Sequence, residues 1–342
     1  MRTAVFTAPD ELDLIQTPTP AVSAGSVLVR VGVCGICGSD LAHLSGYGEF
    51  PYFPGHEFCG TVETIGRDVP ERMVGERVVI NPNLGCGDCP FCRKKLTNLC
   101  DRLKSRRIKS NGGLSDLVSL DSRMVYPLPD SLSSEQAVFI EPLSCALHAV
   151  KRAEPLPNSP IYVSGAGTMG TLVTMILLTR DRRVVLTEVS GVRRELAGRV
   201  FLEAGDRLDL QNFAGDTSGP PRAGQPPVGQ SPAEPPDLVF ECSGSGSALV
   251  QAMQWTRKAG RIVTLGLIIG KMEFPAELIT RKELDLRGAW LNPDTFEEAI
   301  RFAEVNRKTL SRFNTRTFRL SEIKAAFSRA AEPDCHKVLV YP

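Results

Sequence analysis

The chain has 342 residues, of which 42% are hydrophobic and 23% charged, a composition typical of a globular protein with about two domains. Its formal net charge of +1 provides no long-range field that would attract nucleic acid or a membrane surface. Residues 1–14 lack the pattern of a secretory signal, and the longest apolar run, 172–178, is too short to span a bilayer. We therefore expect a cytoplasmic protein that acts on small molecules.

The chain up to about residue 150 predicts a β-rich domain. Short apolar runs at 26–31, 60–62 and 75–80 are separated by Gly and Pro, which is typical of strands joined by tight turns.

Four cysteines in this part lie unusually close together in the sequence. They are spaced by two, two and seven residues: Cys86, Cys89, Cys92 and Cys100. Four thiolates complete the tetrahedral shell of Zn²⁺ and leave no position for water, which predicts a structural zinc in the segment 86–100. An iron–sulfur cluster is the rival interpretation of closely spaced cysteines. A zinc ribbon that binds nucleic acid is a further alternative, because the run 104–109 is basic.

From residue 161 the pattern changes to alternating strands and helices. A strand at 161–163 leads into a glycine-rich turn, a helix follows to residue 179, and a second strand occupies 184–187. Later strands are predicted at 238–241 and 262–265. This order predicts βαβ units and a parallel sheet, so we expect an α/β fold.

The glycine-rich turn has the spacing of a dinucleotide-binding motif. It consists of Gly165, Gly167 and Gly170, with Thr168 and Met169 between the last two, and it opens the helix after a strand. Backbone N–H groups at such a turn bind a pyrophosphate at the positive end of the helix. Glu188 ends the next strand, where a carboxylate accepts hydrogen bonds from the adenosine ribose and repels a 2′-phosphate. The sequence therefore favours NAD, and NADP is the alternative because Arg193 and Arg194 follow closely.

The C-terminal part of the chain contains one irregular segment and three predicted elements. Residues 212–236 are rich in Pro and Gly without helical periodicity, and we expect this loop to be mobile. Beyond it, helices are predicted at 294–305 and 321–330, followed by a strand at 337–341.

Further motifs complete a family pattern in chain order. Gly35-Ile36-Cys37-Gly38-Ser39-Asp40 and Gly55-His56-Glu57 precede the four cysteines, and Glu141-Pro142-Leu143 precedes the glycine-rich turn. With these motifs the chain resembles zinc-containing medium-chain dehydrogenases, in particular the polyol branch with sorbitol, threonine and galactitol-phosphate dehydrogenases. The resemblance implies a GroES-like catalytic domain (1–150 and 286–342) with a zinc lobe, and a doubly wound Rossmann domain (151–285). It also implies a homodimer, with a tetramer as the alternative.

A second, catalytic zinc is expected at four side chains of different types. Cys37, His56, Glu57 and Glu141 offer a thiolate, an imidazole and two carboxylates, which suit a zinc that keeps one exchangeable position. The resemblance makes Cys37 and His56 firm ligands and lets Glu57 and Glu141 share the remaining positions. Zinc there lowers the pKa of a substrate hydroxyl, which then releases hydride.

Three neighbouring residues are assigned supporting roles by the same resemblance. Asp40 orients His56 through its other ring nitrogen, and Ser39 begins a proton relay to solvent. Relatives often have a relay histidine at the position of Ala42. His43 follows one residue later, which on a helix turns the side chain by about 100° and leaves its relay role open.

The expected substrate is a secondary alcohol of a polyol, sugar or cyclitol. Glu49 is a candidate for binding hydroxyls or the ammonium of an aminosugar, which leaves room for an enzyme of aminoglycoside biosynthesis. Arg106 and Arg107 would suit a substrate phosphate, so a sugar-phosphate polyol dehydrogenase is an alternative. A zinc-free reductase and a non-catalytic zinc-binding relative are the remaining ones. The resemblance also places Arg193 beside the adenine.

Overall fold

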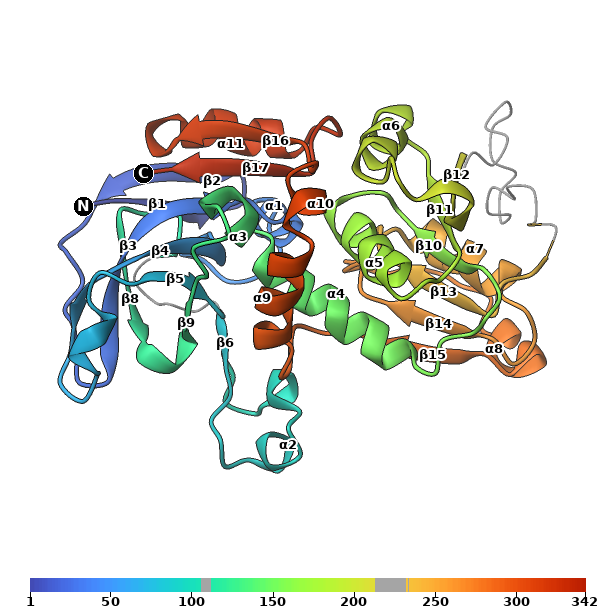
Figure 1. The fold of residues 1–342 in the computed structure, drawn as a ribbon, viewed down its shortest axis with the longest axis horizontal. Helices are drawn as coiled ribbons and strands as arrows, with labels where there is room; N and C mark the ends of the chain where they lie inside the picture. The colour runs from blue at the N-terminus through green and yellow to red at the C-terminus, as the bar shows by residue number, and fades with distance from the viewer. Residues whose placement is uncertain (106–111, 213–231, 233) are drawn as a thin grey trace. The chain divides into compact units, whose positions relative to one another are not determined.

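The computed structural model describes residues 1–105, 112–212, 232 and 234–342 (Figure 1). These residues form two compact units, 1–144 with 291–342 and 145–290. The expected boundary between residues 285 and 286 falls inside β15 (Asp285–Gly288), which pairs with β14 (Arg261–Thr264) in the second unit. Most of the loop expected at 212–236 lies outside the described residues.

The first unit is built on a seven-stranded sheet in which β16 and β17 are parallel and the other pairs are antiparallel. The order is β16-β17-β3-β4-β5-β9, and β8 also pairs with β3. The strands are β3 (Ser26–Gly35), β4 (Glu57–Ile65), β5 (Arg77–Ile80), β8 (Leu117–Asp121), β9 (Val125–Pro127), β16 (Thr315–Arg319) and β17 (Lys337–Tyr341). Valines at every second position of β3 from Val27 to Val33 are buried, because alternate side chains of a strand point to one face.

Further elements surround this sheet. A hairpin is formed by β1 (Arg2–Ala8) and β2 (Glu11–Gln16). The helices are α1 (Gly38–Leu44), α3 (Ser134–Ala137), α9 (Phe296–Val305), α10 (Arg307–Leu310) and α11 (Ile323–Ala330), and the short 3₁₀ helices are η1 (Glu71–Met73), η3 (Ser122–Met124) and η5 (Leu320–Glu322). Helix α4 (Ile140–Ala153) begins in the first unit and ends in the second.

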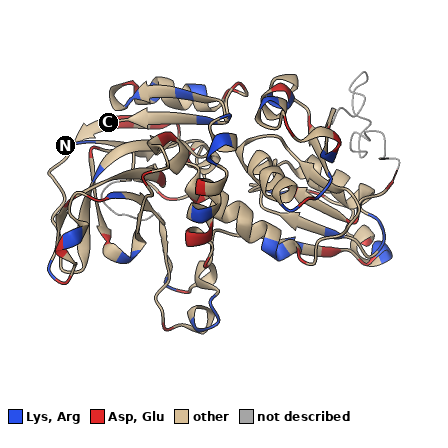
Figure 2. Cartoon of the chain, viewed as in Figure 1, with Lys and Arg blue, Asp and Glu red and all other residues tan. Residues whose placement is uncertain are grey.

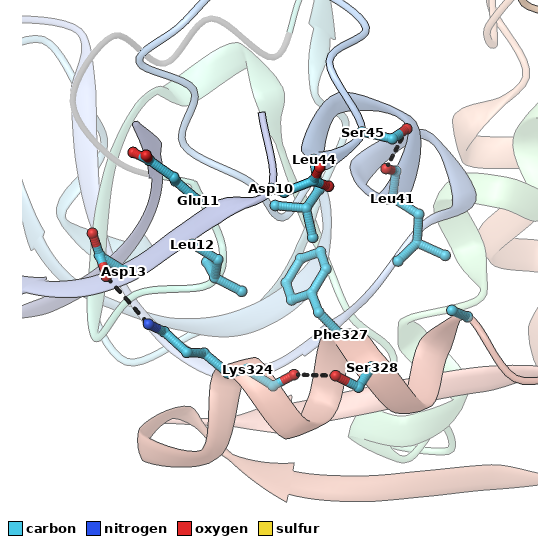
Figure 3. A pocket seen from close by; sticks show the side chains of 11 residues that line it. Asp10, Glu11, Leu12, Asp13, Leu41, Leu44, Ser45, Lys324, Phe327 and Ser328 are labelled. Atoms are coloured by element: carbon cyan, nitrogen blue, oxygen red, sulfur yellow. Dashed lines mark hydrogen bonds and ion pairs between the residues drawn. The ribbon is translucent and has the colours of Figure 1, made fainter. Parts of the chain in front are cut away.

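Helix α1 is anchored by its apolar side chains. Leu41 and Leu44 pack against the core cluster that includes Phe327 of α11 and Leu12 of β2. Figure 3 shows these four side chains around one surface hollow, whose rim carries the carboxylates of the hairpin. The anchored helix fixes the residues that precede and begin it, which include several predicted site residues.

The second unit is a doubly wound domain with a six-stranded parallel sheet. The strand order is β12-β11-β10-β13-β14-β15. The remaining strands are β10 (Ile161–Ser164), β11 (Val184–Glu188), β12 (Leu208–Asn212) and β13 (Leu238–Glu241), and the helices are α5 (Thr168–Thr179), α6 (Gly191–Val200), η4 (Gly205–Arg207), α7 (Gly246–Trp255) and α8 (Glu277–Lys282). Strand β10 is fully buried, as expected for a central parallel strand.

The distribution of charged residues over the structure agrees with the small net charge of the chain. Basic and acidic residues are interspersed along the chain in both units (Figure 2). Among the described residues, no helix combines the length and the hydropathy needed to cross a membrane.

Candidate active site and metal centres

The four cysteines converge in a small lobe of the first unit. Its elements are β6 (Asn83–Leu84), α2 (Pro90–Arg93), η2 (Thr97–Leu99) and β7 (Lys104–Ser105). The sulfur atoms of Cys86, Cys89, Cys92 and Cys100 all lie within 4.8 Å of one another. The apolar cluster of the lobe consists of these cysteines and Leu103. Such a set of thiols fits a closed, tetrahedral Zn²⁺ site.

Hydrogen bonds in the lobe favour the thiolate of Cys89, whereas the pKa of Cys86 and that of Cys92 are raised above the ordinary value. The N–H of Cys89 donates to Cys86 Sγ at 3.4 Å, and the N–H of Cys92 donates to Cys89 Sγ at 3.4 Å. The second bond is the main cause that lowers the pKa of Cys89 to about 6. The guanidinium of Arg102 donates to Cys86 Sγ at 3.4 Å and also pairs with Asp88. These donors offset part of the negative charge that four thiolates would place together.

A second group of possible metal ligands lies where β3 and β4 pair. Cys37 follows the end of β3 and caps α1, while His56 and Glu57 stand at the start of β4. Gly35 pairs with Glu57 in the antiparallel register, so the two strands bring residues about twenty positions apart together. One ligand atom from each of Cys37, His56 and Glu57 lies within 4.8 Å of the other two.

Asp40 lies behind this group and is fully buried. Its Oδ2 accepts the N–H of Cys37 at 3.1 Å, and its Oδ1 lies 3.5 Å from His56 Nδ1. The geometry suits the expected orienting role, because contact at Nδ1 directs Nε2 toward a metal. The hydroxyl of Ser39 donates to Cys37 Sγ at 3.3 Å.

His43 lies half-buried in the last turn of α1. Its Nδ1 is 3.2 Å from the backbone oxygen of Ser39, and its ring stacks on Tyr52 with centroids 4.0 Å apart. The contact with Ser39 is therefore through the backbone, while the Ser39 hydroxyl turns to sulfur. The relay role of His43 stays a prediction, and the ring has a packing role in addition.

Glu141 and an unpredicted lysine border the donor group. Glu141 is buried near the start of α4, although its carboxylate is outside the 4.8 Å group. Lys337 Nζ lies 2.9 Å and 2.7 Å from the two carboxylate oxygens of Glu57, and both side chains are at most 4% exposed. Burial lowers the pKa of Lys337, but the charges of Glu57, Cys37 and Glu141 raise it above its ordinary value overall. The lysine is therefore an ammonium within an anionic cluster.

In the second unit the glycine-rich turn joins β10 to α5. Gly165 has φ of +96°, and a Cβ on Gly170 would lie 1.7 Å from the Gly165 oxygen, so both positions require glycine. Gly167 is the N-cap of α5, and Thr168 and Met169 form its first turn with their N–H groups at the helix N-terminus. The arrangement fits a pyrophosphate.

Glu188 ties this turn to the end of β11. The carboxylate accepts the N–H of Ala166 at 2.8 Å and the N–H of Ser190 at 2.9 Å, and the residue is 5% exposed. Arg194 donates to the backbone oxygens of Glu188 and Val189. Arg193 is half-buried in the first turn of α6.

Models of two protein families match the chain, one in each part. The alcohol dehydrogenase GroES-like domain matches residues 23–130, and the zinc-binding dehydrogenase family matches residues 230–304.

The chain belongs to the zinc-containing medium-chain dehydrogenase/reductase superfamily.

Similar proteins span this dehydrogenase from end to end. D-arabinitol dehydrogenase 1 of Uromyces fabae is 26% identical over 100% of this chain and 97% of its own. An alcohol dehydrogenase of Escherichia coli CFT073 in complex with NADH has a TM-score of 0.84 and 27% identity, covering 100% of this chain and 99% of that one. A zinc-binding dehydrogenase of Sinorhizobium meliloti 1021 bound to NADP has a TM-score of 0.84 and 28% identity, with the same coverage. The chain is accordingly an oxidoreductase similar to polyol dehydrogenases.

Three buried polar residues of this dehydrogenase escaped the sequence analysis. Lys337 begins an otherwise apolar strand, which is the one sequence signal that was available for it. Tyr52 donates a hydrogen bond to Asp40, and no motif indicates this contact. Glu241 ends β13 and accepts the N–H groups of Ser243 and Gly244 at 2.7 Å and 3.0 Å, so it shapes the turn after that strand.

Proposed function

We propose that this dehydrogenase oxidises a secondary hydroxyl of a polyol, sugar or cyclitol to the ketone and passes the hydride to NAD. The observation that carries the proposal is the approach of Cys37, His56 and Glu57 within 4.8 Å in a chain that also holds a glycine-rich dinucleotide turn. A mixed set of thiolate, imidazole and carboxylate suits a catalytic zinc with an exchangeable position, whereas the four-cysteine set suits a structural one.

The chain's own residues take separate parts in this proposal. Cys37 and His56 hold the zinc, with Glu57 and Glu141 sharing further positions. Bound there, zinc is a Lewis acid that lowers the pKa of a substrate hydroxyl. The Ser39 hydroxyl, 3.3 Å from Cys37 Sγ, is near enough to pass the released proton onward, with His43 as a candidate for the next step.

The cofactor preference rests on Glu188. Its buried carboxylate already orders the glycine-rich turn, and its negative charge disfavours a 2′-phosphate. Arg194 is engaged with two backbone carbonyls, which reduces its value as a phosphate ligand. Gly165, Gly167, Thr168, Met169 and Gly170 would receive the pyrophosphate, and Arg193 would flank the adenine. NADP is the alternative, because the similar Sinorhizobium dehydrogenase is bound to NADP.

Two finer substrate classes follow from single side chains. Glu49 is exposed on the loop after α1 and would suit the ammonium of an aminosugar or aminoglycoside. A phosphorylated polyol would need Arg106 and Arg107, which lie outside the described residues. A panel of polyols, cyclitols, aminosugars and sugar phosphates, assayed by NADH formation, decides between them. If no member of the panel is oxidised, the result would favour the alternative that this protein is a non-catalytic, zinc-binding relative of the dehydrogenases.

The metal assignment is tested by zinc content per chain, measured by mass spectrometry on the parent and on Cys37→Ser. We expect two zincs in the parent and one in the variant. One zinc in both proteins would leave only the four-cysteine lobe metallated, and a zinc-free reductase would replace the proposal.

We propose, finally, that the enzyme is a homodimer. Strand β15 is an edge of the parallel sheet, and Leu286 on it is 39% exposed. An edge strand with exposed apolar side chains is suited to pair with a second copy.

A further inference from the structure

Asp40, beside the proposed catalytic zinc site, has hydrogen-bond partners in addition to the proposed zinc ligands. Asp40 is 0% exposed, and its carboxylate contacts both the N–H of Cys37 and the ring of His56. The same Oδ1 that faces His56 also receives the hydroxyl of Tyr52 at 3.2 Å and lies 3.5 Å from the N–H of Gly55. Tyr52 therefore donates a side-chain hydrogen bond to the same carboxylate oxygen that faces His56.

Tyr52 is itself immobilised on three sides. Its backbone N–H and oxygen pair with Phe6 at 2.9 Å and 2.8 Å. The ring stacks on Phe6 with centroids 5.6 Å apart and on His43 with centroids 4.0 Å apart. The residue is 8% exposed. A phenol held in this way has one orientation, so its hydroxyl is a fixed donor rather than a mobile one.

We propose that Tyr52 is a positioning residue of the catalytic zinc site, which acts by anchoring Asp40 and thereby the ring of His56. The inference rests on the proposed function, in which Cys37 and His56 ligate zinc. An aspartate beside Nδ1 of a ligand histidine, here at 3.5 Å, favours one tautomer and one ring plane, and it does so only if its own rotamer is fixed. The ring of His43 stacks on the phenol and so helps to hold Tyr52 in place.

The test uses the full-length zinc-loaded protein and a chromophoric chelator that competes for zinc. The zinc of the four-cysteine lobe is an internal reference, because the hydroxyl of Tyr52 donates to Asp40, which lies beside the other zinc site. We expect Tyr52→Phe, which keeps the stacked ring, to weaken zinc binding at the Cys37–His56 site by about tenfold, at the low end of losses typical of groups behind a metal ligand. Cobalt substituted at this site should also show a changed visible spectrum.

Two further variants separate positioning from general packing. Asp40→Asn should weaken zinc more than Tyr52→Phe, and the double variant should match Asp40→Asn alone, because the hydroxyl acts through Asp40. Tyr341→Phe is the matched control: it removes a tyrosine hydroxyl that donates to Glu135 at 2.6 Å and should leave zinc affinity unchanged.

The outcomes distinguish this inference from the proposed function. If Cys37→Ser keeps both zincs, the catalytic zinc site is wrong and the role of Tyr52 falls with it. If Cys37→Ser loses one zinc while Tyr52→Phe binds zinc like the parent, or if the losses in the double variant add, only the role of Tyr52 is overturned.

Discussion

Lys337 and Glu57 form an ion pair that is buried among the proposed ligands of the catalytic zinc. The ammonium lies 2.7 Å from Glu57 Oε2, and the charges of Cys37 and Glu141 also act on it. Removing one partner of a buried pair leaves an uncompensated charge, which costs roughly 3–5 kcal/mol. In Lys337→Met we expect a loss of that size in protein whose catalytic zinc has been dialysed away. The loss should be clearly smaller in protein with two zincs, because the metal supplies the missing positive charge.

Urea unfolding of both forms measures the two losses. Lys337→Arg keeps a cation and should retain most of the stability in each form. Equal losses for Lys337→Met with and without the second zinc would mean that the side chain only fills space.

Glu188 is expected to select the cofactor as well as to order the turn. Glu188→Gln removes the charge while keeping an oxygen that can accept the N–H of Ala166. The ratio of kcat/KM for NAD to that for NADP should fall by about tenfold, which corresponds to about 1.4 kcal/mol. Glu195→Gln, an exposed carboxylate on α6 paired with Arg199, is the control and should leave the ratio unchanged. If kcat/KM falls equally with NAD and with NADP, Glu188 only orders the glycine-rich turn and does not select the cofactor.

The sequence predicts those parts of the site that come from short motifs, but it does not predict contacts between residues that are far apart in the chain. Cys37, His56 and Glu57 stand in compact motifs, and one ligand atom from each lies within 4.8 Å of the other two, whereas Glu141, expected in the same zinc site from a distant motif, is outside that group. Lys337 meets Glu57 across 280 positions because β17 pairs beside β3, and no periodicity within either strand indicates that. The turn of His43 toward Tyr52 likewise depends on a bridge between Tyr52 and Phe6.

The four-cysteine lobe is an element with almost no apolar core of its own. Its buried cluster consists of cysteines with Leu103, and the ribbon β6–β7 pairs over only two residues in each strand. Bound metal must then provide much of the folding free energy of the lobe. We expect Cys92→Ser to lose one zinc and to become open to trypsin at Arg93, Lys94 and Lys95, while the catalytic zinc stays bound.

Metal analysis and mass spectrometry of a timed tryptic digest check this expectation. Cys335→Ser, at a half-buried thiol outside the lobe, should behave like the parent in both assays. Retention of two zincs in Cys92→Ser, or an unchanged digest, would show that the lobe is held by protein contacts instead.

Elements with strong periodicity were predicted well, and their ends less so. The βαβ unit from β10 to β11 and the final strand β17 were predicted within about one residue. The helix expected at 321–330 begins at Ile323, because residues 320–322 form a 3₁₀ turn in which Arg319 N–H donates to Glu322. Such a cap depends on local geometry that hydrophobic spacing does not encode.

At the scale of the whole molecule, the parallel sheet of the described residues ends at strand β15. β15 is last in the strand order, and the segment before it exposes Leu267, Ile269 and Phe274 at 38%, 46% and 44%. An edge strand together with exposed apolar side chains favours association. We expect the parent to have the mass of two chains in light scattering after gel filtration. Leu286→Glu should shift it toward one chain, because like charges would meet where two β15 strands approach.

Leu202→Glu provides the matched control for this prediction. Leu202 is 74% exposed, follows α6 and lies away from β15 in the strand order, so a carboxylate there should not change the mass. If both variants keep the mass of two chains, the copies pair through another surface. If the parent itself has the mass of one chain, the apolar edge serves a different contact. A dimer lost only in Leu286→Glu would place the subunit interface at the edge of the dinucleotide-binding sheet, and zinc content unchanged in that variant would separate assembly from metal binding.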